Sequence, residues 1–428
     1  MKMDILKKIF EHKLYKETFW AFASKLYSFA TFYLLQFFLI RSLTVENWGI
    51  WSVFITVINI LNLVLNLGID SSVRIFAARF SQNLMLKPMI RELLTIRILS
   101  NLFFVILFVI FFPEIEKTFE HNLLIGCAVY LLPIIFFYTC NEFFKAMFEG
   151  LHRLKFNFIL NFVDFTFRLV IILAYFNSYH NFSFLALAYT CALGLASFVG
   201  FVIYLSKYFT LEKVENKSQF YKEFVKTAFP VFIVCMGVFI SFEIDVLLIK
   251  YFIGDYETGI YATAKQMIIY LPNFTMILTM GTLPAFAQIN DGNRIALKQR
   301  FYKIERFNNV IITTLCIFIL ILSPFLVPLF FGDAYTKSVW VILLYLPYVL
   351  FLCHSILTGY LLDYNGLLLI RMKNIIMTFV IHLALNLILI PQIGALGAPI
   401  AASVGYFWCA WKNRIEVQKL LNSEAKFL

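Results

Sequence analysis

Residues 308–330 read N-N-V-I-I-T-T-L-C-I-F-I-L-I-L-S-P-F-L-V-P-L-F and include no charged side chain. Because an α-helix rises about 1.5 Å per residue, roughly 20 apolar residues cross the hydrocarbon core of a bilayer. Apolar and polar residues do not alternate along this stretch as they do in the strands of membrane barrels. The stretch therefore predicts a transmembrane α-helix.

The rest of the chain has the same apolar character. Of 428 residues, 61% are hydrophobic and 14% are charged, with a mean hydropathy of +0.82, whereas soluble chains contain about 45–50% apolar and about 25% charged residues. A single globular core cannot bury this excess, and only helices and closed barrels span a bilayer. We therefore predict an all-α polytopic membrane protein. It has about twelve transmembrane helices, expected at residues 19–40, 48–68, 93–112, 122–140, 157–176, 183–205, 228–250, 259–284, 308–330, 338–362, 374–391 and 396–411. Kinks are expected at Pro272, Pro347 and Gly405.

The distribution of basic residues predicts the orientation. The net charge of +11 does not indicate a nucleic-acid partner, because Lys and Arg lie in short segments between apolar ones. Of 36 such residues, 29 lie before the first span, after the last, or in even-numbered connections, and four lie in odd-numbered connections. Since cytoplasmic segments are enriched in Lys and Arg, both termini are expected in the cytoplasm.

An internal repeat predicts two halves. Leu43–Trp51 reads L-T-V-E-N-W-G-I-W and Ile253–Tyr261 reads I-G-D-Y-E-T-G-I-Y, at an offset of 210 residues. Each stretch lies between the first and second expected span of its half. Repeats that both begin in the cytoplasm are parallel and are related by an axis along the membrane normal. We expect six-helix bundles at residues 1–210 and 211–428.

The sequence contains no motif typical of catalysis, of a metal site or of a cleaved targeting signal. The seven cysteines are scattered singly in apolar stretches, with no C-x-x-C and no histidine at metal spacing. The chain contains no G-x-x-x-x-G-K-[ST], no H-E-x-x-H and no G-x-S-x-G. The N-terminal segment lacks the apolar core and cleavage site of a signal peptide. We therefore expect no metal, no cofactor, no ATP hydrolysis and no enzymatic activity.

Several stretches resemble a known family. Asn386–Tyr406, N-L-I-L-I-P-Q-I-G-A-L-G-A-P-I-A-A-S-V-G-Y, resembles the penultimate-helix signature of the polysaccharide-type flippases in the MATE/MOP superfamily. Phe229–Ala264, residues 65–79 (L-N-L-G-I-D-S-S-V-R-I-F-A-A-R) and residues 329–335 (L-F-F-G-D-A-Y) are similar to other parts of that pattern. The chain departs from the lipid II flippases of the superfamily, which usually have additional helices.

The resemblance implies a MOP-type fold and a Wzx-like role in O-antigen, lipopolysaccharide or capsule biosynthesis. The expected substrate is an undecaprenyl-diphosphate oligosaccharide, flipped to the outer leaflet of the bacterial inner membrane by alternating access without ATP. Other expected partners are membrane lipids and a polysaccharide polymerase. Two alternatives remain: an ion-coupled multidrug antiporter of the same superfamily, and a membrane-embedded sugar polymerase or ligase, although the outer loops are short for a catalytic site.

A flippase must carry a diphosphate and sugars through about 30 Å of hydrocarbon. Since unpaired polar groups are costly there, a cationic, polar cavity is expected. Asn157, Asn161, Asp164 and Arg168 follow one another at helical spacing on one stripe of their span. The expected substrate-binding candidates are Lys25, Asn59, Asn62, Asn66, Asn161, Arg168 and Lys265.

Each candidate also has a structural interpretation. The amides are suited to joining neighbouring helices, Lys25 to reaching the interface, and Asp164 with Arg168 to locking helices together. Four residues are candidates for ion coupling or ion pairing: Asp164, Glu243, Asp245 and His382. An Asp245–Lys265 pair linking two spans is one expectation, and a structurally satisfied His382 is another.

Overall fold

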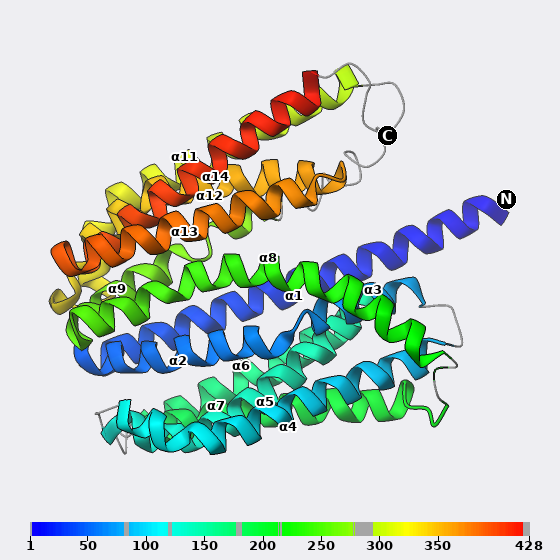
Figure 1. Ribbon diagram of the computed structural model, residues 1–428, viewed down its shortest axis with the longest axis horizontal. Helices are drawn as coiled ribbons and strands as arrows, with labels where there is room; N and C mark the ends of the chain where they lie inside the picture. Colours follow the sequence, from blue (N-terminus) through cyan, green and yellow to red (C-terminus); the bar gives the residue numbers. More distant parts are fainter. Residues whose placement is uncertain are drawn as a thin grey trace. The chain divides into compact units, whose positions relative to one another are not determined.

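The computed structural model describes residues 2–80, 85–118, 122–176, 182–212, 214, 216–276, 278 and 294–422. Within these ranges all regular structure is helical (Figure 1). The helices are α1 (Lys2–Ser42), α2 (Val45–Asn66), α3 (Ile69–Arg79), α4 (Leu86–Thr118), α5 (Asn122–Gly150), α6 (Leu154–Phe176), α7 (Phe182–Lys207), α8 (Lys217–Phe252), α9 (Asp255–Ile268), α11 (Arg294–Phe331), η1 (Asp333–Tyr335), α12 (Ser338–Tyr364), α13 (Leu368–Ile393), η2 (Gly394–Leu396) and α14 (Gly397–Asn422).

Each of the twelve expected spans coincides with a helix for at least part of its length. In the described ranges, eight helices are long and apolar enough to cross a membrane, and the segments Lys217–Gly237 and Phe242–Phe252, bent by 43°, make a possible ninth. The all-α polytopic prediction is therefore confirmed. The eighth span, 259–284, is described only through residue 276 and at residue 278; the rest lies outside the described residues.

The expected kinks have different outcomes. α9 ends at Ile268, and helix resumes only at Pro272. α12 runs through Pro347 as one helix, and α14 runs through Gly405. A proline costs a helix one backbone hydrogen bond, which surrounding packing can offset.

The chain forms two compact units. The N-terminal unit comprises Met1–Phe38 and Val57–Cys235, and the C-terminal unit comprises Leu39–Thr56 and Met236–Leu428. The first half of α2 thus packs with the C-terminal unit. The repeat boundary at residue 210, which concerns sequence periodicity, stays a prediction.

The core of the N-terminal unit surrounds α5. Phe143, Met147 and Phe148 are fully buried against residues of α3, α4, α6, α7 and α8. Between α2 and α3 the chain turns at Leu67 and Gly68, where φ is 48° and 74°. A Cβ on Gly68 would lie 2.3 Å from the carbonyl oxygen of Ala228. Only glycine combines this backbone conformation with so close an approach.

The C-terminal unit contains a crossing of α2 and α9 that reflects the repeat. A Cβ on Gly49 would lie 2.1 Å from the carbonyl oxygen of Asp255, and one on Gly259 would lie 2.1 Å from that of Val45. Gly49 and Gly259 are equivalent at the 210-residue offset, and so are Val45 and Asp255. The two helices therefore meet backbone to backbone through symmetry-related positions, which accounts for glycine at both.

Candidate functional site

The N-terminal unit holds an ion pair on α6. Arg168 Nη2 donates to Asp164 Oδ1 at 2.5 Å, and the side chains are 13% and 5% exposed. The guanidinium carbon lies 4.1 Å from the ring centroid of Tyr189 on α7. Arg168 Nε is buried and has no hydrogen-bond partner in the protein. The expected i,i+4 pair therefore forms, and it leaves part of the cation's donor capacity unused.

The α1 candidates contact the same helix. Asn161 Nδ2 donates to Ser24 Oγ at 2.9 Å, and the hydroxyl oxygens of Tyr27 and Thr166 are 2.6 Å apart. These bonds join α1 to α6, so Asn161 acts at least in part as a link between helices. Lys25 is exposed.

The α2 amides have different environments. Asn59, Asn62 and Asn66 are all half-buried. Asn62 Oδ1 is buried without a protein partner. Asn66 Nδ2 donates to Asp70 Oδ2 at 2.8 Å, and Asn66 Oδ1 accepts from the Asp70 backbone N–H at 3.1 Å. Asn66 therefore stabilises the α2–α3 turn, whereas Asn62 has acceptor capacity to spare.

Arg97 was counted among the 29 basic residues outside the expected odd-numbered connections, as part of the connection before span 93–112, but it lies inside α4. Arg97 is fully buried inside α4, pairs with Asp70 and donates to the carbonyl oxygen of Leu65 at 3.2 Å. It thereby holds the end of α2 and the start of α3. Its position four residues into the expected span 93–112 was the signal that the residue lies within the helix.

The C-terminal unit holds a denser cluster, the Asp245 cluster, made of Asp245 on α8, Tyr261 on α9, Tyr345 on α12, and His382 and Asn386 on α13. Asp245 accepts hydrogen bonds from Tyr261 Oη at 2.7 Å, Tyr345 Oη at 3.4 Å and Asn386 Nδ2 at 2.6 Å. His382 Nε2 lies 3.2 Å from Asp245 Oδ1. Asp245, His382 and Asn386 are each at most 1% exposed.

His382 gives the Asp245 cluster two hydrogen-bonding states. Its Nε2 lies 3.1 Å from Asn386 Nδ2, and its Nδ1 is buried without a protein partner. A neutral imidazole with its proton on Nδ1 accepts at Nε2 from the amide, whereas an imidazole with a proton on Nε2 donates to the carboxylate. The ring can therefore bond either the Asn386 amide or the Asp245 carboxylate through Nε2.

A second pair lies beside this cluster. Lys265 on α9 donates to Glu243 Oε2 at 3.1 Å and also hydrogen-bonds the carbonyl oxygen of Phe242. Thr56 Oγ1 donates to the same Glu243 oxygen at 3.0 Å. The expected Asp245–Lys265 pair is corrected: the two acids point to different sides of α8, and Lys265 lies on the side of Glu243.

The candidates thus fall into separate groups. Arg168, Asp164 and Asn161 come together on α6, and Asp245 and His382 come together between α8 and α13. Glu243 and Lys265 pair with each other. Among the side chains that the structure places, no three His, Cys, Asp or Glu residues are arranged to hold a metal ion.

The comparison with protein families decides the membership of the chain. A family model described as "Polysaccharide biosynthesis protein" matches residues 14–290, nearly two thirds of the chain. The chain belongs to that family. No curated protein matches the chain in sequence.

Solved structures show the fold of this family member. A multidrug resistance MATE family transporter of the MOP superfamily, in an inward-facing conformation, matches with a TM-score of 0.76 at 14% identity, over 92% of this chain and 96% of the other. The lipid II flippase MurJ, in an inward closed conformation, matches with a TM-score of 0.76 at 11% identity, over 94% and 87%. A MOP superfamily transporter from Pyrococcus furiosus matches with a TM-score of 0.64 at 14% identity, over 94% of each chain. The protein is a multi-pass membrane protein with the MATE/MOP fold, as the sequence resemblance implied.

Proposed function

We propose that this protein flips a polyprenyl-diphosphate-linked oligosaccharide from the cytoplasmic to the outer leaflet of a bacterial inner membrane. The observation that carries the proposal is a shared fold: a member of the polysaccharide biosynthesis family has the architecture of a lipid II flippase. Lipid II is itself a lipid-linked saccharide. Both termini would lie in the cytoplasm, and a polysaccharide polymerase would consume the product.

Arg168 is our candidate for binding the diphosphate. A planar guanidinium offers several donors to an oxyanion, and Nε of Arg168 is buried without a partner in the protein. Stacking on Tyr189 fixes its orientation. Asn62, with its unpaired oxygen, would accept from sugar hydroxyls, and exposed Lys25 would attract the anionic headgroup at the start of the step.

The Asp245 cluster is our candidate for ion coupling. Protonation of His382 would replace an amide-centred arrangement of hydrogen bonds by an ion pair with Asp245. Because the cluster joins α8, α9, α12 and α13, that change would alter how these helices are held together. We propose that uptake and release of one proton at His382 accompanies each transport cycle.

The test is complementation of a strain that lacks its own repeat-unit flippase. Arg168→Ala should abolish surface polysaccharide while the protein remains expressed in the membrane. Without Arg168 the diphosphate of the substrate would be an unpaired anion inside the bilayer, which costs several kcal/mol. Arg79→Ala is the matched control, because Arg79 also pairs with a carboxylate, Glu223, but is 56% exposed. Normal polysaccharide in Arg168→Ala would remove Arg168 from the site.

A multidrug antiporter is the second candidate, because a multidrug MATE transporter matches the fold equally well. The flippase and antiporter functions can be distinguished in the same strain. The flippase proposal requires that the wild-type protein restore polysaccharide without raising resistance to cationic drugs. Drug resistance without polysaccharide would favour the antiporter.

A further inference from the structure

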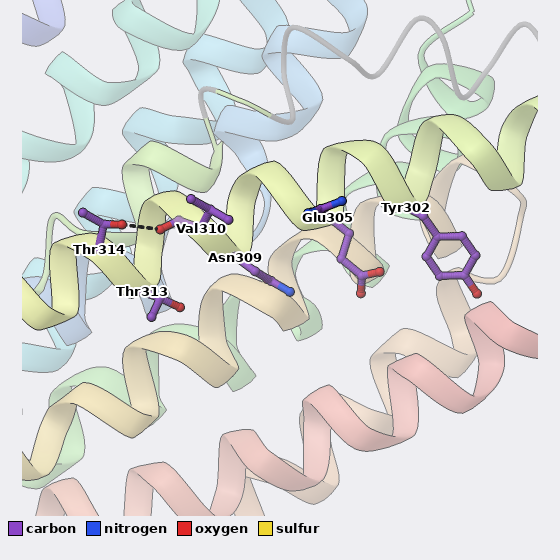
Figure 2. A pocket seen from close by; sticks show the side chains of 7 residues that line it. Tyr302, Glu305, Asn309, Val310, Thr313 and Thr314 are labelled. Atoms are coloured by element: carbon purple, nitrogen blue, oxygen red, sulfur yellow. Dashed lines mark hydrogen bonds between the residues drawn. The ribbon is translucent and has the colours of Figure 1, made fainter.

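A groove on the C-terminal unit has no role in the function proposed above. It lies between α11, α12 and α14 and encloses about 410 Å³. Asn309 and Thr313 of α11 also line an adjoining pocket of about 570 Å³. Figure 2 shows Glu305, Asn309 and Thr313 pointing to the same side of α11. Their spacing of four residues places them on one face of the helix.

One end of this groove is polar and basic. Arg414 of α14 pairs with Glu305, and its guanidinium carbon lies 5.4 Å from the ring centroid of Tyr302. His354 Nδ1 of α12 lies 3.5 Å from the same Glu305 oxygen. Arg414 neutralises the negative charge of the Glu305 carboxylate. Exposed Arg306 adds a further positive charge beside the groove.

A buried donor points to a missing acceptor. Asn308 lines the groove and is only 1% exposed. Its Oδ1 accepts from Thr275 Oγ1 at 2.7 Å, but its Nδ2 has no hydrogen-bond partner in the protein. Buried amide donors are nearly always satisfied, so this one indicates a polar ligand or water in the groove.

The groove is also lined by apolar residues, some of which are exposed at the surface of the protein. Leu350 and Phe351 of α12 and Phe407 and Ala410 of α14 continue the groove away from Glu305. Phe407 is 53% exposed, and the exposed residues of α11 beside the groove include Val310 at 58%. A polar, basic end joined to an outward-facing apolar channel matches a molecule with an anionic head and an acyl chain.

At the polar end of the groove, aromatic and basic residues have the arrangement typical of the boundary between membrane and water. Lys412 Nζ lies 4.8 Å from the ring centroids of both Trp408 and Trp411. Tryptophan and lysine side chains gather where a helix leaves the hydrocarbon for the headgroup layer. Basic pockets between transmembrane helices at that depth bind anionic lipid headgroups.

We infer that the groove between α11, α12 and α14 binds one anionic phospholipid of the surrounding membrane. Its phosphate is held by Arg414 and the Asn308 amide, and one acyl chain lies along Leu350, Phe351 and Phe407. The inference is independent of what the protein transports. A free phosphate would leave the apolar part of the groove unoccupied, and a zwitterionic lipid would place a second cation beside Arg306 and Arg414.

The test measures lipid binding to the delipidated full-length protein in detergent by native mass spectrometry. Phosphatidylglycerol and phosphatidylcholine with identical acyl chains are titrated separately. We expect phosphatidylglycerol to bind about tenfold more tightly, because the choline cation of phosphatidylcholine would lie beside Arg306 and Arg414. The double variant Glu305→Gln, Arg414→Gln leaves the net charge unchanged and should lose this preference.

The matched control is Arg79→Gln, Glu223→Gln, which removes an Arg–Glu pair of the N-terminal unit and should keep the preference. Asn309→Trp, at an exposed position lining both pockets, should weaken binding of both lipids by filling the groove. If the double variant fails to fold, Asn309→Trp still tests whether the lipid binds in this groove.

Three results would overturn the inference. One is equal affinity of the wild-type protein for the two lipids. Another is displacement of phosphatidylglycerol by millimolar inorganic phosphate, which would mean that the site takes the anion alone. The third is a dimer that dissociates in Asn309→Trp, which would mean that a second copy of the chain covers the groove.

Discussion

In the N-terminal unit, Asp164 finds its cation four residues along the same helix, whereas in the C-terminal unit Asp245 draws its partners from three other helices. A pair within one helix stays intact when that helix moves relative to its neighbours. The Asp245 cluster, in contrast, changes its hydrogen bonds whenever α8, α9, α12 or α13 shifts. In the function that we propose, the local pair would hold the ligand and the interhelical cluster would respond to a proton.

The largest change in stability is expected for Asp245→Leu. This variant leaves Tyr261, Tyr345 and Asn386 without their shared acceptor in a site that is almost closed to solvent. Removal of one member of a buried ionic cluster costs about 3–5 kcal/mol. The measurement is thermal unfolding of the purified protein in detergent, together with polysaccharide complementation, and we expect a lower midpoint temperature and no transport.

Asp245→Asn separates the two roles of this residue. The amide oxygen still accepts hydrogen bonds, so most of the stability should remain, but the side chain no longer forms an ion pair with protonated His382. We expect folded protein that does not transport. Normal transport by Asp245→Asn would contradict proton coupling at this cluster.

The next largest loss of stability is expected at the crossing of α2 and α9. It tests whether backbone contacts also join the helices of the C-terminal unit. Gly49→Ala and Gly259→Ala each place a Cβ 2.1 Å from a carbonyl oxygen, so α2 and α9 must move apart. Overpacking of this kind costs about 1–3 kcal/mol. Because the two positions are equivalent in the repeat, their unfolding midpoints should fall by similar amounts.

Gly194→Ala is the control in the N-terminal unit. Its Cβ would meet only the Phe137 side chain, at 3.3 Å, and this ring can shift by a few tenths of an ångström. Its midpoint should stay near that of the wild type. A large loss for Gly49→Ala together with no loss for Gly259→Ala would contradict the symmetry-related crossing.

The sequence was sufficient to predict the transmembrane helices, because each one depends on a run of apolar residues that are neighbours in the chain. Runs of apolar residues predicted twelve spans, each of which coincides at least in part with a described helix. The match of 43–51 with 253–261 predicted a repeat, and the α2–α9 crossing contains equivalent positions of it. The separate helix α3 was not predicted, because the chain is interrupted by only two residues, Leu67 and Gly68, whose left-handed backbone has no hydropathy signal.

Partners across helices were predicted less well than partners within one. The Asp164–Arg168 pair followed from i,i+4 spacing alone. For Lys265 the spacing offered two acids, Glu243 and Asp245, and the choice depends on how α8 and α9 are rotated about their axes. Rotation is set by packing of the whole unit, including the close approach at Gly259, which a single sequence does not specify.

The smallest change in stability is expected for the double variant Asp164→Leu, Arg168→Met, and it sharpens the comparison between the two units. Because Asp164 and Arg168 are removed together, no buried charge is left unpaired, and apolar residues of similar size take their place. Such replacements are close to neutral, within about 1 kcal/mol, or stabilising. The unfolding midpoint should therefore match the wild type, while polysaccharide complementation is lost because the cation is gone. Asp245→Leu combined with His382→Leu should still lower the midpoint, since Tyr261, Tyr345 and Asn386 lose the acceptor that they share. If the α6 double variant were instead as unstable as Asp245→Leu, the pair would be a structural lock, and diphosphate binding would have to be sought at another cation of the protein.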